Sequence, residues 1–198
     1  MAEGNPKDLF QSVMQLAADE KIREALNSLK CLTAAAQIRT QAERIAAAAK
    51  EMAAGEKEVG PVTSDLPAAK GVFGPMEGGF RGMSGMLEGL ANKELAAIFT
   101  LTMPVDRLYA EAHFRRSRVL ADMLAASSYY RVTAELISLA MKTLDKCAAA
   151  MKAGEIALLL GHASALLVDA ARFMATAGAE LADNDVRWED LKAAVKQL

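Results

Sequence analysis

The side chains best suited to chemistry in this chain are two histidines, two cysteines and a short run of arginines. His162 stands in the apolar run LLLGHASALL, and an exposed histidine on a helical bundle could accept a phosphoryl group. Such a site needs a lysine and a glycine closely after the histidine, but alanine, serine and leucine follow here. The sequence therefore favours a buried or half-buried histidine that is bonded to a helix carbonyl or a facing side chain.

A metal site would need more ligands than two histidines provide. Glu111 precedes His113 by two residues, so on a helix the two side chains would point to different sides. Neither a Glu-x-x-His pair nor a His-Glu-x-x-His motif is present. Met83 and Met86 offer soft thioethers for Cu(I), but methionines at this spacing are more typical of a flexible apolar surface. We predict no metal and no cofactor.

The basic run RRSR at 115–118 could bind a phosphate group. However, Glu111 precedes Arg115 by four residues, and Arg118 precedes Asp122 by four. This spacing favours ion pairs along a solvated helix face, each worth a few tenths of a kcal/mol. We therefore expect an ion-paired stripe rather than an anion site.

No catalytic signature is present in the sequence. The serines have no matching base, and there is no Gly-x-Ser-x-Gly elbow, Walker loop or dinucleotide-binding fingerprint. A net charge of −2 and a pI near 5.8 disfavour nucleic acid as a partner. These observations predict a protein that is not an enzyme, and no motif identifies a known family.

The most distinctive element is a glycine-rich segment within an alanine-rich chain. Seven of the 13 glycines lie between positions 71 and 89. The bulky apolar residues of this segment recur two positions out of phase with the glycines, at Phe73, Met76, Phe80, Met83, Leu87 and Leu90. On a helix this spacing places a glycine face opposite an apolar face. Because each glycine costs about 1 kcal/mol relative to alanine, we expect the segment to need a partner surface before it becomes ordered. The alternative is that Met76, Met83, Leu87 and Leu90 simply pack on the bundle.

Apolar residues keep helical spacing over nearly all of the remaining chain. The expected helices begin or end at Asn5-Pro6, Asp19, Gly55, Pro104, Gly154 and Asp183-Asn184-Asp185. One helix of some thirty residues is expected between Asp19 and Gly55. The helix at Glu155–Leu181 is apolar nearly all round, so we expect it at the centre of the bundle.

Together these elements predict an all-α protein, an antiparallel bundle of four to six helices with long helices and one long Gly/Met/Phe-rich excursion. The length suits a single helical domain over residues 1–198. Residues 55–92 are expected to form a flexible connector and a conditional helix inserted in that domain. The reason is that residues 55–70 carry two prolines, two glycines and little periodicity.

The sequence also bears on the compartment. The start MAEGNPKDLF has no basic or apolar region of the signal-peptide type, and no run of 18 apolar residues occurs. Cys31 and Cys147 follow no pattern and are interpreted as buried thiols in a reducing compartment. A cytoplasmic location is therefore expected.

Three functions remain open from the sequence. The leading hypothesis is a non-enzymatic assembly, structural or adaptor protein that self-associates or binds a protein partner through the Phe73–Leu90 segment. The alternative is a peripheral membrane protein, whose same segment lies in the membrane surface as an amphipathic helix. A ligand-binding or phosphotransfer bundle around His162 ranks lowest.

Overall fold

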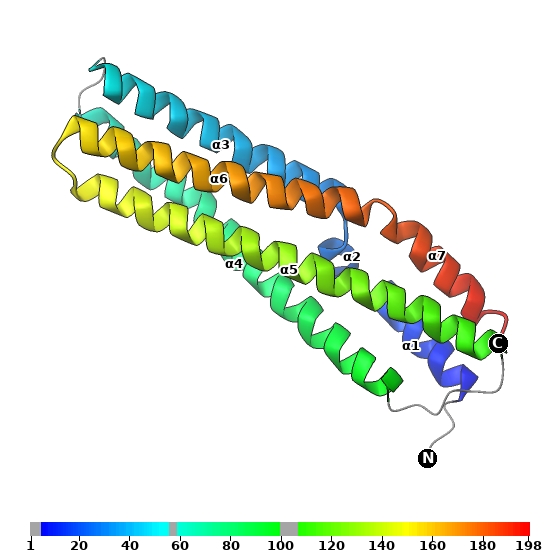
Figure 1. Cartoon of the computed structure of the whole chain (residues 1–198). Coiled ribbons are helices and arrows are strands. Elements are labelled where there is room, and N and C mark those ends of the chain that lie inside the picture. Colours follow the sequence, from blue (N-terminus) through cyan, green and yellow to red (C-terminus); the bar gives the residue numbers. More distant parts are fainter. Residues whose placement is uncertain (1–4, 56–58, 100–106) are drawn as a thin grey trace. The chain divides into compact units, whose positions relative to one another are not determined.

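The fold is that of a computed structural model, which describes residues 5–55, 59–99 and 107–198. These residues form seven helices and no strand. The helices are α1 (Pro6–Ala18), α2 (Glu20–Ala25), α3 (Ser28–Ala54), α4 (Val59–Phe99), α5 (Arg107–Ala149), α6 (Ala153–Leu181) and α7 (Asn184–Val195). The predicted all-α bundle with long helices is confirmed (Figure 1).

The predicted signals begin and end the first helices. The side chain of Asn5 accepts a hydrogen bond from the Lys7 backbone N–H at 3.0 Å, and Pro6 occupies the first turn. Asp19 caps α2 in the same way. At the end of α3, Gly55 adopts a positive φ of 71°, which glycine tolerates and other residues resist.

The single helix expected between Asp19 and Gly55 is broken into α2 and α3. The Asn27 side chain accepts a hydrogen bond from the Lys30 backbone N–H at 3.1 Å. Asparagine competes in this way with the helical hydrogen bonds, and it therefore favours a new helix start over an uninterrupted helix. The predicted boundary at Pro104 lies outside the described residues.

Contacts between residues gather in two compact units, each assembled from separate stretches of the chain. Unit 1 comprises Met1–Lys30, Met83–Ser128 and Ala177–Leu198, and unit 2 comprises Cys31–Gly82 and Tyr129–Thr176. Helices α4, α5 and α6 each contribute to both units. The single domain that the chain length predicts stays a prediction.

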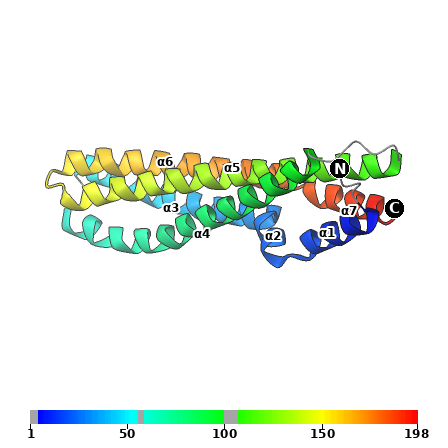
Figure 2. The ribbon, with the colours of Figure 1, turned by 90° about the horizontal axis from the view of Figure 1, so that it is seen from below.

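In unit 2, α4 and α5 lie side by side and run in opposite directions (Figure 1, Figure 2). Lys70 pairs with Asp145, and Arg81 pairs with Glu135 at 2.7 Å. The residue number therefore rises along α4 while it falls along α5, as an antiparallel pair requires. On the neighbouring pair of helices, α3 and α6, the Ser164 hydroxyl donates a hydrogen bond to the Ala42 carbonyl oxygen at 2.8 Å.

The position of α6 in unit 2 differs from the one expected. One side of the helix is buried, through Ile156, Leu160, Ala163, Leu167, Ala170, Ala171 and Met174. The opposite side is open, and Leu158 is 75% exposed. The prediction that this helix lies at the bundle centre is therefore wrong, because the surrounding helices cover only one of its faces.

Unit 1 has its own core, where α1 and α7 lie side by side (Figure 1, Figure 2). This core contains Leu9, Val13, Tyr109, Ala112, Val119, Leu191 and Val195, with Phe10, Trp188 and Ala194 packed against it. These residues come from α1, α5 and α7. Helices α1 and α7, which lie at opposite ends of the described chain in sequence, therefore stabilise each other.

The region expected to be a flexible connector and conditional helix is an integral helix from Val59 onward. Residues 56–58 of the predicted connector lie outside the described residues. Leu66, Phe73, Phe80 and Leu87 recur every seven residues on α4, and all four are buried. This packing stabilises the helix despite its glycines, because most helical stability in proteins comes from tertiary contacts.

Candidate interaction surfaces

The apolar face of α4 is turned toward the interior of the chain. Phe73, Phe80 and Leu87 are buried, so for these three residues the prediction of an outward contact surface is wrong. For Leu87, the burial agrees with the alternative that the residues of this segment pack on the bundle. Met76, Met83 and Leu90 are half-buried, and their contact role stays a prediction.

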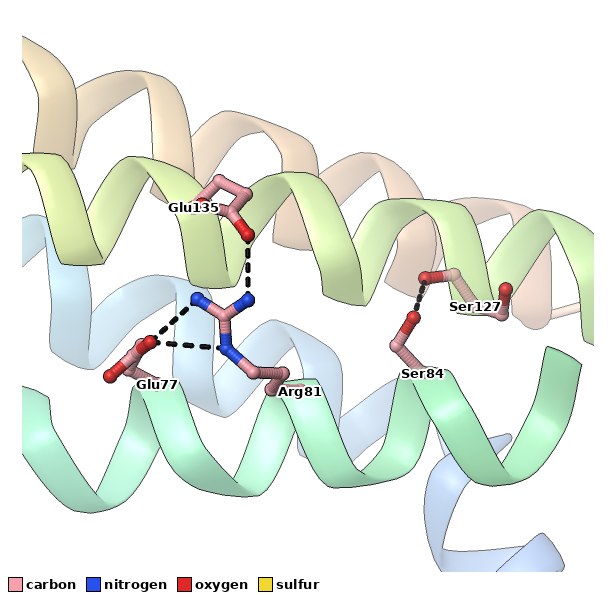
Figure 3. A network of polar contacts seen from close by, with 5 residues as sticks. All are labelled: Glu77, Arg81, Ser84, Ser127 and Glu135. Carbon is pink, nitrogen blue, oxygen red and sulfur yellow. Dashed lines mark hydrogen bonds and ion pairs between the residues drawn. The ribbon is translucent and has the colours of Figure 1, made fainter.

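The polar residues of α4 face α5 in two places (Figure 3). In unit 2, the Arg81 guanidinium donates to Glu77 on its own helix and to Glu135 on α5, each at 2.7 Å. Both carboxylates raise the pKa of Arg81 above its usual value. In unit 1, the buried Ser84 hydroxyl donates to the Ser127 carbonyl oxygen at 2.8 Å. These polar contacts help to fix the register of α4 against α5.

The glycines of α4 are turned the other way. Gly71, Gly78, Gly79, Gly82, Gly85 and Gly89 are exposed, and Gly74 is half-buried. A methyl group added at any of the seven would meet no atom within 4 Å. Nothing in the described chain therefore requires glycine at these positions.

The outer side of α6 carries an exposed apolar surface in unit 2. We define the α6 face as Leu158, Gly161, Ala165 and Val168, which follow one another at steps of three and four residues and are all exposed. Leu158 is 75% exposed and Val168 48%. The sequence has no charged residue between Glu155 and Asp169. An exposed apolar surface without charge is a candidate contact site.

A stretch that starts at Ala153 is also long and apolar enough, by length and composition alone, to cross a membrane. Its most apolar window has a mean hydropathy of 1.5, and 39% of that window is buried. Core helices of soluble proteins satisfy the same test, so this observation weighs little by itself.

The two histidines have different surroundings, and those of His162 differ from the ones expected. His162 is exposed beside the α6 face, so the prediction that it is buried or half-buried is wrong. His113 is buried in unit 1, and neither of its ring nitrogens has a hydrogen-bond partner among the described residues. Burial lowers the pKa of His113. The rings of Tyr109 and His113 pack edge to face, with their centroids 4.6 Å apart. Within the described residues, no group of three or more His, Cys, Asp or Glu side chains could hold a metal ion.

The three arginines of the basic run have three different surroundings in unit 1. Arg116 is buried, where it binds Glu94 and donates to the Ser12 hydroxyl at 3.1 Å. This burial could not be predicted from the exposed ion-pair spacing. Arg115 binds Glu111 at 2.8 Å, as predicted, and lies 3.7 Å from Asp190.

Arg118 does not form the ion pair with Asp122 that the spacing predicts. Asp122 instead forms an ion pair with Arg187 of α7. With the Asn184 amide oriented so that both of its ends have partners, its nitrogen donates a hydrogen bond to Asp122 at 3.1 Å. Asn184 in turn accepts from the Trp188 indole nitrogen at 3.1 Å. A long-range partner has therefore replaced the local one, a change that sequence spacing cannot show.

Two hollows lie beside this network in unit 1. A cleft of about 560 Å³ borders Trp188, Leu29 and Leu16, with both signs of charge at its rim, so it indicates no single ligand charge. A smaller groove of about 240 Å³ borders the exposed ring of Phe114 and the side chain of Arg118.

Comparison with family models, curated proteins and solved structures finds no match to this chain.

Proposed function

We propose that this chain is a non-enzymatic helical assembly protein, and that two copies associate through their α6 faces. The single observation that carries the proposal is the exposed, uncharged surface of Leu158, Gly161, Ala165 and Val168 on a helix whose other side is already packed. Burial of such apolar surface against a partner is favourable by about 25 cal/mol per Å². This proposal keeps the self-association expected from the sequence but moves it from α4 to α6.

The composition of the α6 face suits a helix rather than an irregular loop. Gly161 and Ala165 are small residues four positions apart, flanked by Leu158 and Val168. Small residues at this spacing let two helix backbones approach closely, while the flanking side chains fill the space on either side. A second helix with the same pattern fits this surface.

The pattern is also self-complementary. Gly161 and Ala165 each lie two residues from position 163, and Leu158 and Val168 each lie five residues from it. If two copies of α6 cross antiparallel at this level, Leu158 of each copy meets Val168 of the other. Such reciprocal contacts are what a two-fold symmetric interface requires. A second copy of the chain is therefore the partner that the surface favours.

Charge supports the same orientation. Glu155 lies eight residues before position 163, and Arg172 lies nine residues after it, so the antiparallel crossing brings them close together. Glu155 has no ion-pair partner among the described residues, whereas Arg172 binds Asp169 of its own helix at 3.0 Å and remains 71% exposed. A parallel crossing would instead bring like charges together.

Light scattering after size-exclusion chromatography, at two protein concentrations, tests the proposal. Leu158→Glu should weaken association by at least about 100-fold, because it removes an apolar contact and buries a charge. The matched control is Leu139→Glu, since Leu139 is a 48% exposed residue of α5 in the same unit. Both variants should keep the helical circular dichroism of the parent chain.

The orientation has its own test. Glu155→Arg and Arg172→Glu should each weaken association, and the double variant should restore it. If the single variants behave like the parent chain, the antiparallel crossing is wrong even where Leu158→Glu acts as expected.

The membrane alternative is an outcome of the same experiment, extended with liposome flotation. The chain could prove monomeric at both concentrations, float with neutral and anionic vesicles, and lose flotation in Leu158→Glu. This result would show membrane binding in place of self-association. A monomer that does not float would contradict both functions.

A further inference from the structure

We propose that the groove between α5 and α7 in unit 1 binds a carboxylate that is attached to an apolar group. The groove is lined by Glu111, Phe114, Arg115, Arg118, Arg187 and Asp190. This site is independent of the α6 face, which belongs to unit 2.

The charge of the groove is concentrated on one side chain. Arg115 is neutralised by Glu111 and Asp190. Arg187 forms an ion pair with Asp122, which does not line the groove. Arg118 has no ion-pair or hydrogen-bond partner among the described residues. Arg118 is therefore the one arginine of the groove lining without an ion-pair partner among the described residues.

A single unpaired guanidinium beside carboxylates suits a small anion rather than a polyanion. The carboxylates of Glu111 and Asp190 line the same groove and would repel the successive phosphates of a nucleic acid. A guanidinium can bind one carboxylate through two parallel N–H···O hydrogen bonds, which gives both strength and orientation. A monoanionic carboxylate therefore fits the charge and the volume of about 240 Å³.

The wall beside Arg118 supplies the second element of recognition. Phe114 lies one helical turn before Arg118 and is 64% exposed. Burial of such an aromatic ring would be favourable. An apolar group next to the carboxylate would cover this ring while the carboxylate binds Arg118. Two sources carry this chemistry, a small organic acid and the last residue of a peptide.

Titration of the full-length chain, followed by amide chemical shifts, tests the site with defined probes. N-acetylphenylalanine should bind saturably and shift the signals of Phe114 and Arg118, whereas its neutral amide should bind at least about tenfold more weakly. Arg118→Gln should lower the affinity for the acid by a similar factor. The matched control Arg39→Gln removes an exposed arginine of unit 2 and should leave the affinity unchanged.

Two further probes are needed. One distinguishes a peptide end from a small acid, and the other tests whether any small anion binds. If acetyl-Ala-Ala-Phe binds more tightly than N-acetylphenylalanine, the ligand is a peptide end, and equal affinities indicate a small acid. Inorganic phosphate that binds as well as the aromatic acid would reduce the site to an adventitious ion only. Equal binding of the acid and the amide, or an unchanged affinity in Arg118→Gln with correct folding by circular dichroism, would overturn the proposal.

Discussion

The ring centroids of Phe80 and Tyr130 lie 5.7 Å apart, and the Tyr130 hydroxyl oxygen lies 3.2 Å from the Cys31 sulfur. This chain of contacts joins α4, α5 and α3 within unit 2. Phe80→Ala should lower the free energy of unfolding by about 3–5 kcal/mol, because it removes a large side chain from this core. Urea denaturation measures the change. Met76→Ala, at a half-buried position of the same helix, is the matched control, and a loss there as large as at Phe80 would contradict the assignment of Phe80 to the core.

The glycines on the outer side of α4 give a prediction of the opposite sign. Gly78→Ala and Gly82→Ala should each raise the free energy of unfolding by about 0.5–1 kcal/mol, because the added methyl meets no atom within 4 Å and alanine is the better helix former. Gly55→Ala is the contrasting control and should destabilise the chain, since Gly55 has a φ of 71°. A loss of stability at positions 78 and 82 that grows with protein concentration would indicate that another chain contacts this face.

The buried His113 should make the stability of the chain sensitive to mild acid. Well above pH 6.5 the histidine is neutral in both the folded and unfolded states, so it adds no pH dependence. Below pH 6.5 the unfolded state binds a proton that the folded state resists, because burial lowers the pKa of His113. The free energy of unfolding should therefore fall as the pH falls, by up to about 1.4 kcal/mol per pH unit, until the pH passes the folded pKa.

Urea denaturation between pH 7.5 and pH 5 measures this effect, and His113→Gln should flatten the profile. His162→Gln, which removes an exposed imidazole, is the matched control. An unchanged slope in His113→Gln would assign the acid sensitivity to other groups.

Both thiols should be protected in the folded chain. Burial raises the pKa of Cys147 from 9.0 to about 11, which alone lowers its thiolate fraction near pH 8 about 100-fold. Burial also raises the pKa of Cys31. A Cys31→Ser variant should therefore react with a disulfide reagent at least about 100-fold more slowly when folded than when unfolded in urea. Rapid reaction of the folded variant would show that Cys147 is accessible.

The sequence predicted those features that depend on neighbouring residues. Asn5, Asp19 and Gly55 begin or end helices because each acts through backbone groups within a few positions. The ion pair of Glu111 with Arg115 formed for the same reason, one turn apart on one helix. The all-α class followed from the apolar spacing in each segment.

Features that depend on distant parts of the chain were not predictable in this way. The apolar spacing of Phe73 and Phe80 is visible in the sequence, but whether these residues pack on their own chain or on a partner depends on where α5 lies. Likewise, nothing near Asp122 in sequence indicates that Arg187 displaces Arg118. The apolar excess of residues 155–181 was recognised, yet the uncovered side of that helix appears only once its neighbours are placed.

The pairing of α1 with α7 has a consequence for synthesis. Leu9 and Val13 pack with Leu191 and Val195, so the residues that bury the first helix leave the ribosome some 180 positions later. At about 5–20 residues per second, the newly made α1 lacks that cover for roughly 10–40 s. During this interval its apolar stripe is open to chaperones and to other nascent chains. Ribosomes that stall before α7 would therefore release a product with an uncovered first helix, which quality-control proteases could recognise.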